Sequence, residues 1–571
     1  MARARALALA LLLNLARGGP AMGWSSFNFF KLENVSEAIY RAAADQLVSL
    51  GLANLGYSFV NTDDAVVLAE RDAAGDLQPD PRVWPSGLRA TVDYVHARGL
   101  RFGIYTARAA LTCGKRAGSC GSEARDAAFY AAHEIDYVKD DACGSCGADS
   151  ALTSYGKMQR ALWATGRPFV LAVEGDPPLA NLSRGGFGNS SRVGADIRPT
   201  FDSIVSLVDQ GSGLWPWAGG ASADLPFWND FDILEVGNGD FDSSAFPLDD
   251  AQGRGQTAAR MHFSFWAALK SPLLLGSNLQ DADAATLAIV GNADALRVSQ
   301  DAARAAVRRV RVAAPRDARL GATPWDAVAV VARCDPTRPT QTWRWAGGAP
   351  GVNASLTTTD GANTTFCLAP APSRENFVGS ANATICASAR WAVLPFNASG
   401  GANSTIVQAP RGPPLWWYTT PLGSGPVPHS QYATGAGAPK PWAVADMDAL
   451  VRGPGSALRA GDEARIPDND LVGNVTVGGA FCLDLVPAGM LETWAGPLSG
   501  GAFAVILFNR SPSPDAITLT WEDLAALGGA RPGPLRVRDV WRGRDAGVFD
   551  SAYTDGTVPA HGVTFLVLMP P

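Results

Sequence analysis

Short runs of apolar residues alternate with longer amphipathic stretches along the first half of the chain. The short runs have the length of buried strands. The longer stretches repeat apolar residues at helical spacing and end before a glycine such as Gly51 or Gly99. Helices are predicted at about 36–50, 88–97, 122–133, 153–165, 200–209 and 256–270. Strands are predicted near 22–28, 57–61, 100–105, 135–138, 169–173, 192–196, 232–236 and 272–276.

This alternation predicts an α/β fold. Eight strands that alternate with helices within about 280 residues match the size and rhythm of a (β/α)8 TIM barrel, and we assign residues 21–307 to it. A doubly wound open sheet is the competing fold. It is disfavoured because no glycine-rich phosphate loop follows the first strand.

The pattern changes at about Arg308. Helical periodicity fades, Pro and Gly become frequent, and short alternating runs such as Phe503–Phe508 predict an all-β antiparallel sandwich over residues 308–571. Residues 315–488 are too apolar and too rich in Trp for a linker, and we predict that they form a large inserted β domain. Its segments Gln341-Thr-Trp343, Cys367-Leu and Cys482-Leu-Asp faintly resemble those of ricin-type lectins, and a domain without binding function is an equal alternative. The insertion contains four cysteines: Cys334, Cys367, Cys386 and Cys482.

The N-terminus predicts export. Arg3 and Arg5 precede the apolar run Ala6–Leu13 and small residues, which is typical of a signal peptide, here assigned to residues 1–20. Ten Asn-x-Ser/Thr motifs, six of them between residues 353 and 474, also favour a glycoprotein of the secretory pathway, extracellular or in a lysosome- or vacuole-like compartment. The eight cysteines are therefore expected to form disulfides. No later segment offers the roughly 20 apolar residues that a membrane span needs.

Composition narrows the kind of ligand. A net charge of −7 without a basic stripe argues against nucleic acid. With five histidines and no Cys/His ligand spacing we predict neither a metal nor a cofactor. A magnesium site at Asp63, Asp64 and Asp141 is a weaker alternative, because no phosphate-binding element accompanies it. The 17 Trp residues suit a carbohydrate site, where aromatic rings pack on sugars.

Acidic residues follow several of the predicted strands. Asp63 and Asp64, Asp140 and Asp141, Asp196, and Asp232 each come near the end of a separate apolar run. In a parallel barrel the carboxyl ends of the strands meet at one rim, so we expect these carboxylates to share one bowl. Paired carboxylates in an exported, Trp-rich protein point to glycoside hydrolysis, which uses one as nucleophile or base and one as acid.

Several motifs resemble glycoside hydrolase family 27, the family of α-galactosidases and α-N-acetylgalactosaminidases. They run in order through about two thirds of the chain, and only the signal segment and the inserted block lack them. Because so many occur together, the resemblance is strong. The motifs are Met22-Gly-Trp24, Gly56-Tyr57, Asn61-Thr-Asp-Asp64, Phe102-Gly-Ile-Tyr105, Asp136-Tyr-Val-Lys-Asp-Asp-Ala-Cys143, Trp228-Asn-Asp-Phe-Asp-Ile-Leu-Glu-Val-Gly-Asn238, His262–Gly276, Ser299-Gln-Asp301 and Trp494-Ala-Gly-Pro497.

The resemblance implies an exo-acting retaining hydrolase that removes terminal α-D-galactose. Asp141 matches the nucleophile of the family and Asp196 matches the acid/base. It also implies a disulfide between Cys113 and Cys143, after which Cys120 and Cys146 could pair. The residues that it implies for binding of the sugar are Phe27, Asp63, Asp64, Tyr105, Lys139, Glu174, Arg192 and Asp232.

Some positions depart from the family pattern. Phe27 replaces a Trp that walls the sugar site, Ala65 replaces a Cys after the Asp pair, and Gly175 replaces a Trp after Glu174. Because these residues line the pocket, the exact sugar is less constrained than the reaction. The alternatives are an α-N-acetylgalactosaminidase, a β-L-arabinopyranosidase, and an inactive carbohydrate-binding glycoprotein. The sequence leaves the oligomeric state open.

Overall fold

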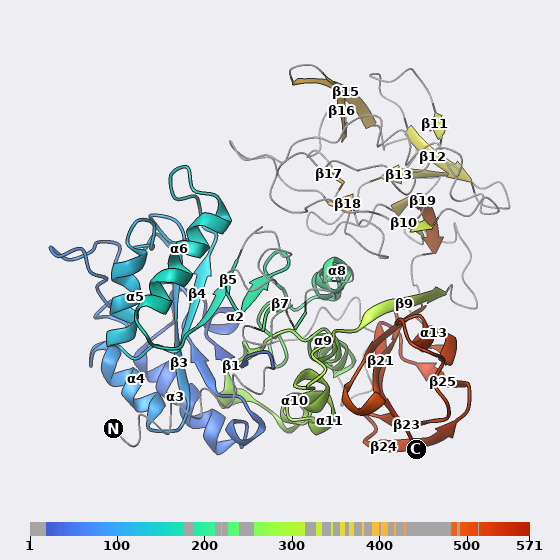
Figure 1. Ribbon diagram of the computed structural model, residues 1–571, viewed down its shortest axis with the longest axis horizontal. Coiled ribbons are helices and arrows are strands. Elements are labelled where there is room, and N and C mark those ends of the chain that lie inside the picture. The colour runs from blue at the N-terminus through green and yellow to red at the C-terminus, as the bar shows by residue number, and fades with distance from the viewer. Residues whose placement is uncertain are drawn as a thin grey trace.

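The computed structural model places the chain as a barrel, a sandwich and a group of strands between them in sequence (Figure 1). The residues that the structure describes are 19–174, 188–211, 218–219, 226–238, 256–313, 491–511 and 513–571, together with separate strand segments between 327 and 487.

Eight parallel strands form the barrel sheet, as predicted, in the order β7-β6-β5-β4-β3-β2-β1-β8. The backbone at Leu234 closes the ring between β7 and β8, because its N–H donates to the carbonyl of Leu274 (2.7 Å) and its carbonyl accepts from Gly276 (2.9 Å). The strands are β1 (Met22–Ser25), β2 (Phe59–Asn61), β3 (Arg101–Ala107), β4 (Tyr137–Asp141), β5 (Val170–Val173), β6 (Ser190–Arg192), β7 (Trp228–Asp230) and β8 (Leu273–Leu275).

Helices cover the outside of this sheet (Figure 1). They form where the sequence shows helical spacing. In α4, Leu88, Val92 and Val95 lie on one face and are buried against the barrel. The helices are α2 (Phe27–Phe30), α3 (Glu37–Ser49), α4 (Leu88–His96), α5 (Glu123–Ala132), α6 (Ala151–Ala164), α8 (Phe201–Gly211), α9 (Gln256–Ala268), α10 (Ala284–Val290) and α11 (Ala293–Ser299).

Two strand predictions need correction. The seventh strand is Trp228–Asp230 and not 232–236, because Asp232 has a φ of 84° that ends the extended backbone before it. The sixth strand ends at Arg192, so Asp196 lies four residues beyond it in a loop. A guanidinium hydrogen bond from Arg192 to the carbonyl of Gly194 (3.3 Å) supports the turn between them.

The C-terminal part is an antiparallel sandwich, as predicted. A six-stranded sheet runs in the order β24-β23-β26-β21-β20-β9, and β22 pairs with β25. Leu507, Leu519, Trp521 and Leu566 are fully or nearly fully buried in its core. Its elements are β9 (Arg308–Ala313), β20 (Leu491–Pro497), β21 (Phe503–Asn509), β22 (Asp515–Thr520), α13 (Trp521–Ala525), β23 (Leu535–Asp539), β24 (Arg544–Phe549), β25 (Ala552–Val558) and β26 (Gly562–Met569).

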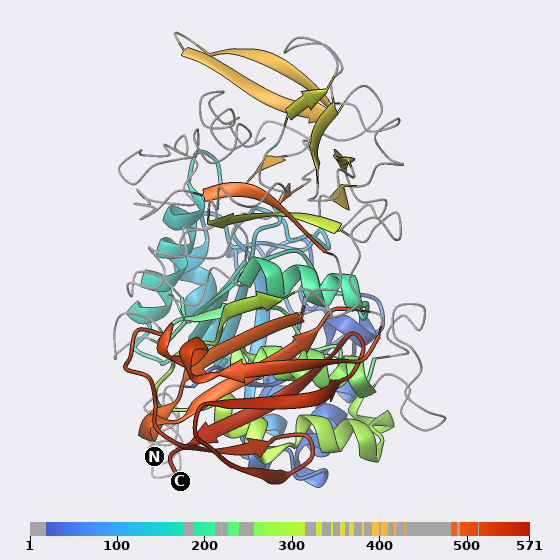
Figure 2. The same cartoon turned by 90° about the vertical axis from the view of Figure 1, so that its right-hand side faces the viewer.

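Residues 314–490 connect two neighbouring strands of the sandwich. Ala313 at the end of β9 is paired directly with Leu491 at the start of β20. The intervening chain therefore leaves and rejoins the sheet at one place, and its strands lie apart from β21 and β23 in both views (Figures 1 and 2). They are β10 (Ala327–Arg333), β11 (Arg344–Ala346), β12 (Ser355–Thr359), β13 (Thr365–Ala369), β14 (Ser380–Ala381), β15 (Trp391–Ala398), β16 (Gly401–Gln408), β17 (Trp416–Trp417), β18 (Pro428–His429) and β19 (Phe481–Pro487).

A buried cluster of ion pairs joins the barrel to the sandwich, which lie side by side in Figure 1. Asp209 of α8 accepts two hydrogen bonds from the guanidinium of Arg510. Arg510 and Arg309 both pair with Glu492 at 3.0 Å. The two acids and two arginines balance one another, which is required of charges buried away from water.

Two observations bear on the predicted export. Among the described residues, no helix is both long enough and apolar enough to cross a membrane. The glycosylation motif at Asn509 is not accessible in the folded chain, because this side chain is buried and donates to the carbonyls of Ser513 and Val558. Asn34, in contrast, is exposed.

Candidate active site

Lys139 organises the charged groups at the carboxyl ends of the barrel strands. Its ammonium group lies 2.8 Å from Asp63 after β2 and 3.0 Å from Glu174 after β5. Burial alone would lower the pKa of Lys139, but the charges of Asp63 and Glu174 outweigh burial and hold this pKa well above its ordinary value. The ammonium group also lies 5.4 Å from the ring centre of Tyr105 and 5.9 Å from that of Phe27.

Arg192 extends this array across the bowl. Its guanidinium contacts Glu174 (3.1 Å), Asp232 (2.8 Å) and Asp196 (3.1 Å). Arg192, Glu174 and Asp232 are mostly buried, whereas the Asp196 side chain is 71% exposed at the rim. The predicted acid therefore faces solvent, and the predicted sugar-binding groups lie deeper.

Glu174 and Asp141 lie in contrasting fields. Burial raises the pKa of Glu174, but the cations Lys139 and Arg192 prevail and lower this pKa to about 2. Burial and the charge of Glu174 raise the pKa of Asp141 to about 6, against the opposing effect of Lys139. A hydrogen bond from the Tyr105 hydroxyl to Oδ2 of Asp141 (2.6 Å) also opposes this rise. The Glu174 carboxylate is therefore ionised at neutral pH, whereas Asp141 gains or loses its proton near pH 6.

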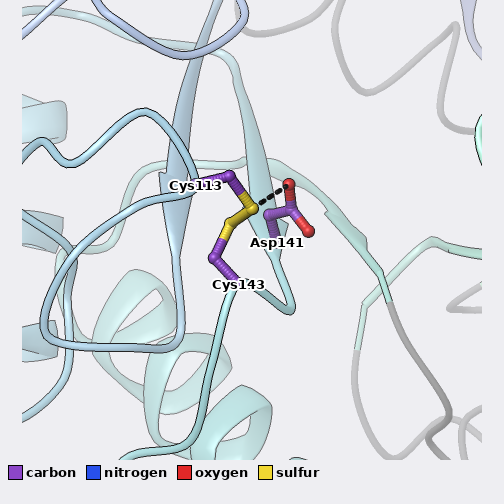
Figure 3. Close-up of side chains that lie close together, drawn as sticks. All are labelled: Cys113, Asp141 and Cys143. Carbon is purple, nitrogen blue, oxygen red and sulfur yellow. Dashed lines mark hydrogen bonds between the residues drawn. A yellow bond between two sulfur atoms is a disulfide. The ribbon is translucent and has the colours of Figure 1, made fainter. Parts of the chain in front are cut away.

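A disulfide links the loops on both sides of Asp141. Cys113 and Cys143 are bonded, with their Cα atoms 5.0 Å apart, and Cys120 and Cys146 form a second bond, so both pairings agree with the prediction. Figure 3 shows the first bond beside Asp141, whose Oδ2 lies 3.9 Å from the sulfur of Cys113. A disulfide sulfur carries no proton and no free thiolate. This group of Cys113, Asp141 and Cys143 is therefore a packing contact and not a metal site.

Asp64 is held by the loop that follows β3. Its carboxylate accepts hydrogen bonds from the hydroxyl of Thr112 (2.8 Å) and from the backbone N–H groups of Gly114 and Ala65 (both 2.6 Å). A Cβ atom at Gly114 would lie 2.9 Å from Oδ2 of Asp64, so this close approach favours glycine. The sequence did not indicate Thr112 and Gly114, because loop residues carry no periodic signal.

The charged groups line a pocket at the carboxyl ends of the barrel strands. Sequence reasoning missed Asp230, which lines it beside Asp232 and is buried. The signal was available, because Asp230 lies in the motif Trp228–Asn238, two residues before Asp232. Burial raises the pKa of Asp230 to about 6, although Arg192 opposes this. The described lining residues are Ser25, Asn61, Thr62, Tyr137, Lys139, Ala172, Val173, Glu174, Arg192, Asp230, Asp232, Ile233 and Leu274.

The structure thus brings together the binding residues that were predicted on the strand ends. Lys139 joins Asp63 to Glu174, Arg192 joins Glu174 to Asp232 and Asp196, and Tyr105 contacts Asp141. Gly175 lies outside the described residues. The arrangement provides one carboxylate beside a cationic array, one carboxylate at the rim, and a polar cavity between strands, which is the equipment of a glycoside hydrolase.

Comparison with known sequences supports this chemistry. A family described as alpha galactosidase A matches residues 19–301, and one described as alpha galactosidase C-terminal beta sandwich domain matches residues 488–568. Alpha-galactosidase 3 of Arabidopsis thaliana is 35% identical over 59% of this chain and 74% of its own length. The alpha-galactosidase of Cyamopsis tetragonoloba is 37% identical over 49% of this chain, and the match spans 64% of that relative.

Solved structures share the fold. The alpha-galactosidase of Saccharomyces cerevisiae with raffinose has a TM-score of 0.60 at 19% identity, over 97% of this chain and 98% of its own. The β-L-arabinopyranosidase of Geobacillus stearothermophilus has a TM-score of 0.55 at 16% identity, over 98% of both chains. At such identities the likeness concerns the fold alone.

Proposed function

We propose that this chain, which belongs to the α-galactosidase family of glycoside hydrolases, removes terminal α-D-galactose with retention of configuration. The observation that carries the proposal is the line of contacts from Asp63 through Lys139, Glu174 and Arg192 to Asp232. These alternating charges offer donors and acceptors to the hydroxyl groups of one sugar, next to the carboxylate of Asp141.

In the first step, an oxygen of the ionised Asp141 attacks the anomeric carbon. The bond from this carbon to the leaving oxygen breaks, and Asp196 donates its proton to that oxygen. The covalent glycosyl-enzyme then reacts with water. Asp196 takes a proton from the water, whose oxygen bonds to the anomeric carbon and releases Asp141.

The contacts of each residue support its proposed role. Tyr105 and the backbone N–H of Ala142 donate to Asp141, and both bonds favour the ionised form that attacks. Asp196 is exposed at the rim, where a leaving group departs toward solvent. In a retaining hydrolase the two carboxyl groups are separated by roughly 5–5.5 Å when they act, and we predict this separation for Asp141 and Asp196.

The binding residues divide between the two ends of the array. We assign Asp63, Asp64 and Lys139 to one group of galactose hydroxyls, and Glu174, Arg192 and Asp232 to the 2-hydroxyl side. We assign Phe27 to the wall of the sugar site. The substrate class is an oligosaccharide, glycolipid or glycoprotein that ends in galactose. The alpha-galactosidases of Arabidopsis thaliana and Cyamopsis tetragonoloba, which are 35% and 37% identical to this chain, support this choice.

Two substitutions test the two carboxylates. Asp141→Asn should abolish turnover of an aryl α-galactoside and of melibiose alike, because no nucleophile remains. Asp196→Ala should retain far more activity on a dinitrophenyl galactoside than on melibiose, because the dinitrophenolate leaving group departs without protonation. Equal losses on both substrates would contradict the role of Asp196 as the acid.

We also propose that the protein works in the secretory pathway, outside the cell or in a lysosome- or vacuole-like compartment. The two disulfides beside the active site support this placement, because such bonds persist in oxidising compartments. Expression in a eukaryotic host should yield a secreted, glycosylated protein that lacks residues 1–20. An intact N-terminus on the secreted protein would contradict the predicted cleavage.

A further inference from the structure

Tyr155 lies behind the active site and has no assigned role. It belongs to α6, it is completely buried, and its hydroxyl donates to the backbone carbonyl of Glu174. Helix α6 packs on the outer surface of the barrel beside α5, so Tyr155 reaches the end of β5 from outside and not from the sugar cavity.

This contact occurs just past the point where the pairing of β5 with its neighbouring strands ends. The β4–β5 pairing ends at Asp140 and Val173, and the β5–β6 pairing ends at Val173 and Ser191. The N–H of Glu174 still donates to the carbonyl of Asp140 (3.1 Å), but the carbonyl of Glu174 lies past the last strand pair. Buried carbonyls require a donor, and Tyr155 supplies it from the helix layer.

The same ring is also connected to Asp141. The guanidinium of Arg108 lies 5.5 Å from the ring centre of Tyr155, close enough for a cation–π contact. The backbone N–H of Arg108 donates to the carbonyl of Asp141 (2.9 Å). Tyr155 therefore links the backbone at Glu174 with the segment that holds the backbone of Asp141.

We propose that Tyr155 is a positioning residue, whose hydroxyl fixes the backbone of Glu174 so that its carboxylate stays between Lys139 and Arg192. The carboxylate lies 3.0 Å from Lys139 and 3.1 Å from Arg192, so both contacts depend on where β5 ends. The inference rests on the proposed function, because the consequence of moving Glu174 is a weaker grip on the sugar. Tyr155 itself touches no substrate.

The chain offers a matched control in Tyr130. This residue lies on the adjacent helix α5 and is also completely buried, and its hydroxyl makes no hydrogen bond to Glu174. Tyr130→Phe and Tyr155→Phe thus each remove one buried hydroxyl from the same helix layer. Only the second should affect the sugar site.

A double-mutant cycle with Glu174→Ala distinguishes positioning from general stability. Tyr155→Phe should lower kcat/KM for an aryl α-galactoside by about fivefold to tenfold, mainly through KM, the size expected for one lost hydrogen bond. In the Glu174→Ala background the same change should have less than a twofold effect. Equal losses in both backgrounds, no loss in either, or an equal loss for Tyr130→Phe would each overturn the proposal.

A crystal structure of Tyr155→Phe tests the same idea without turnover. The Glu174 carboxylate should have moved away from Lys139 and Arg192. An unmoved carboxylate would overturn the positioning role, whatever the kinetics. If the wild-type protein cleaves no α-galactoside, the proposed function fails, and the position of Glu174 in this variant still decides the inference.

Discussion

The hydroxyl of Tyr105 donates a 2.6 Å hydrogen bond to Oδ2 of Asp141. This bond favours the ionised carboxylate and works against burial and the charge of Glu174, which together raise the pKa of Asp141 to about 6. Because the nucleophile must be ionised, kcat/KM should fall as the pH drops below about 6.

Tyr105→Phe should move this acid limb to higher pH, because the bond that lowers the pKa of Asp141 is gone. At pH 5 kcat/KM should fall by roughly tenfold or more, and at pH 8 the loss should be smaller. The pH profile of kcat/KM for an aryl α-galactoside measures both effects.

Tyr57→Phe is the control for Tyr105→Phe. Tyr57 is equally inaccessible and donates to the carbonyl of Val290 (2.7 Å), away from the charged array. Removal of the Tyr57 hydroxyl should leave the acid limb of the kcat/KM profile unchanged. An unshifted limb in Tyr105→Phe, or the same shift in both variants, would contradict the role given to the Tyr105 bond.

Glu174 should set the preference at the 2-position of the sugar. Its carboxylate can accept a hydrogen bond from a hydroxyl but crowds an N-acetyl group. We expect galactosides to be cleaved at least about a hundredfold better than N-acetylgalactosaminides. Glu174→Ala should narrow this ratio, mainly by lowering the rate on galactosides. Equal kcat/KM for both sugars in the wild type would refute the prediction.

The inserted block should be dispensable for cleavage of small substrates. Ala313 and Leu491 face each other across β9 and β20, so a short glycine-rich turn can replace residues 315–488 without moving either strand. Turnover of an aryl α-galactoside should stay within about twofold of the full chain, because the active-site residues are all in the barrel. A folded deletion protein that is inactive would show that the block reaches the site.

The buried ion cluster should hold the two domains together. Arg510→Met leaves Asp209 and Glu492 with one arginine between them, and breaking such a pair costs about 3–5 kcal/mol. Burial opposes ionisation of Asp209, but Arg510 leads the contacts that lower its pKa, so its contribution is present above the ordinary pKa of Asp and is lost in acid.

The thermal midpoint measures the effect of this substitution. It should drop clearly at pH 7, and the difference from wild type should shrink near pH 3. Arg297→Met is the comparison, because the Arg297 side chain is 77% exposed and its partner Asp294 keeps a second contact to Arg538, so the loss should be hardly measurable. A drop at pH 7 no larger than that of Arg297→Met would contradict the docking role.

The sequence predicted the barrel and most of the array for a simple reason. Strand and helix periodicities alternate clearly, and the carboxyl ends of parallel strands must meet, so Asp63, Lys139, Glu174 and Arg192 fall together. The resemblance to a known family, and not periodicity, indicated the roles of the individual residues and the pairing of Cys113 with Cys143.

The features that the sequence did not predict also have physical reasons. Residues 227–236 are all buried, so no alternation of apolar and polar positions marked the end of the strand before Asp232. The exposure of Asp196 depends on a loop whose path follows from the contact of Arg192 with Gly194. Helical spacing predicted a helix over 153–165 but could not show which carbonyl the hydroxyl of Tyr155 reaches.

The most direct test of the account is covalent labelling with 5-fluoro-α-D-galactosyl fluoride. The fluorine at C5 slows both the formation and the hydrolysis of the glycosyl-enzyme, and the fluoride leaving group restores the rate of formation. The glycosyl-enzyme should therefore accumulate. We predict that mass spectrometry finds one fluorogalactosyl group per chain, attached to Asp141 and absent from the Asp141→Asn variant. A label on another residue, or no label together with an inverted first product, would contradict the central claim.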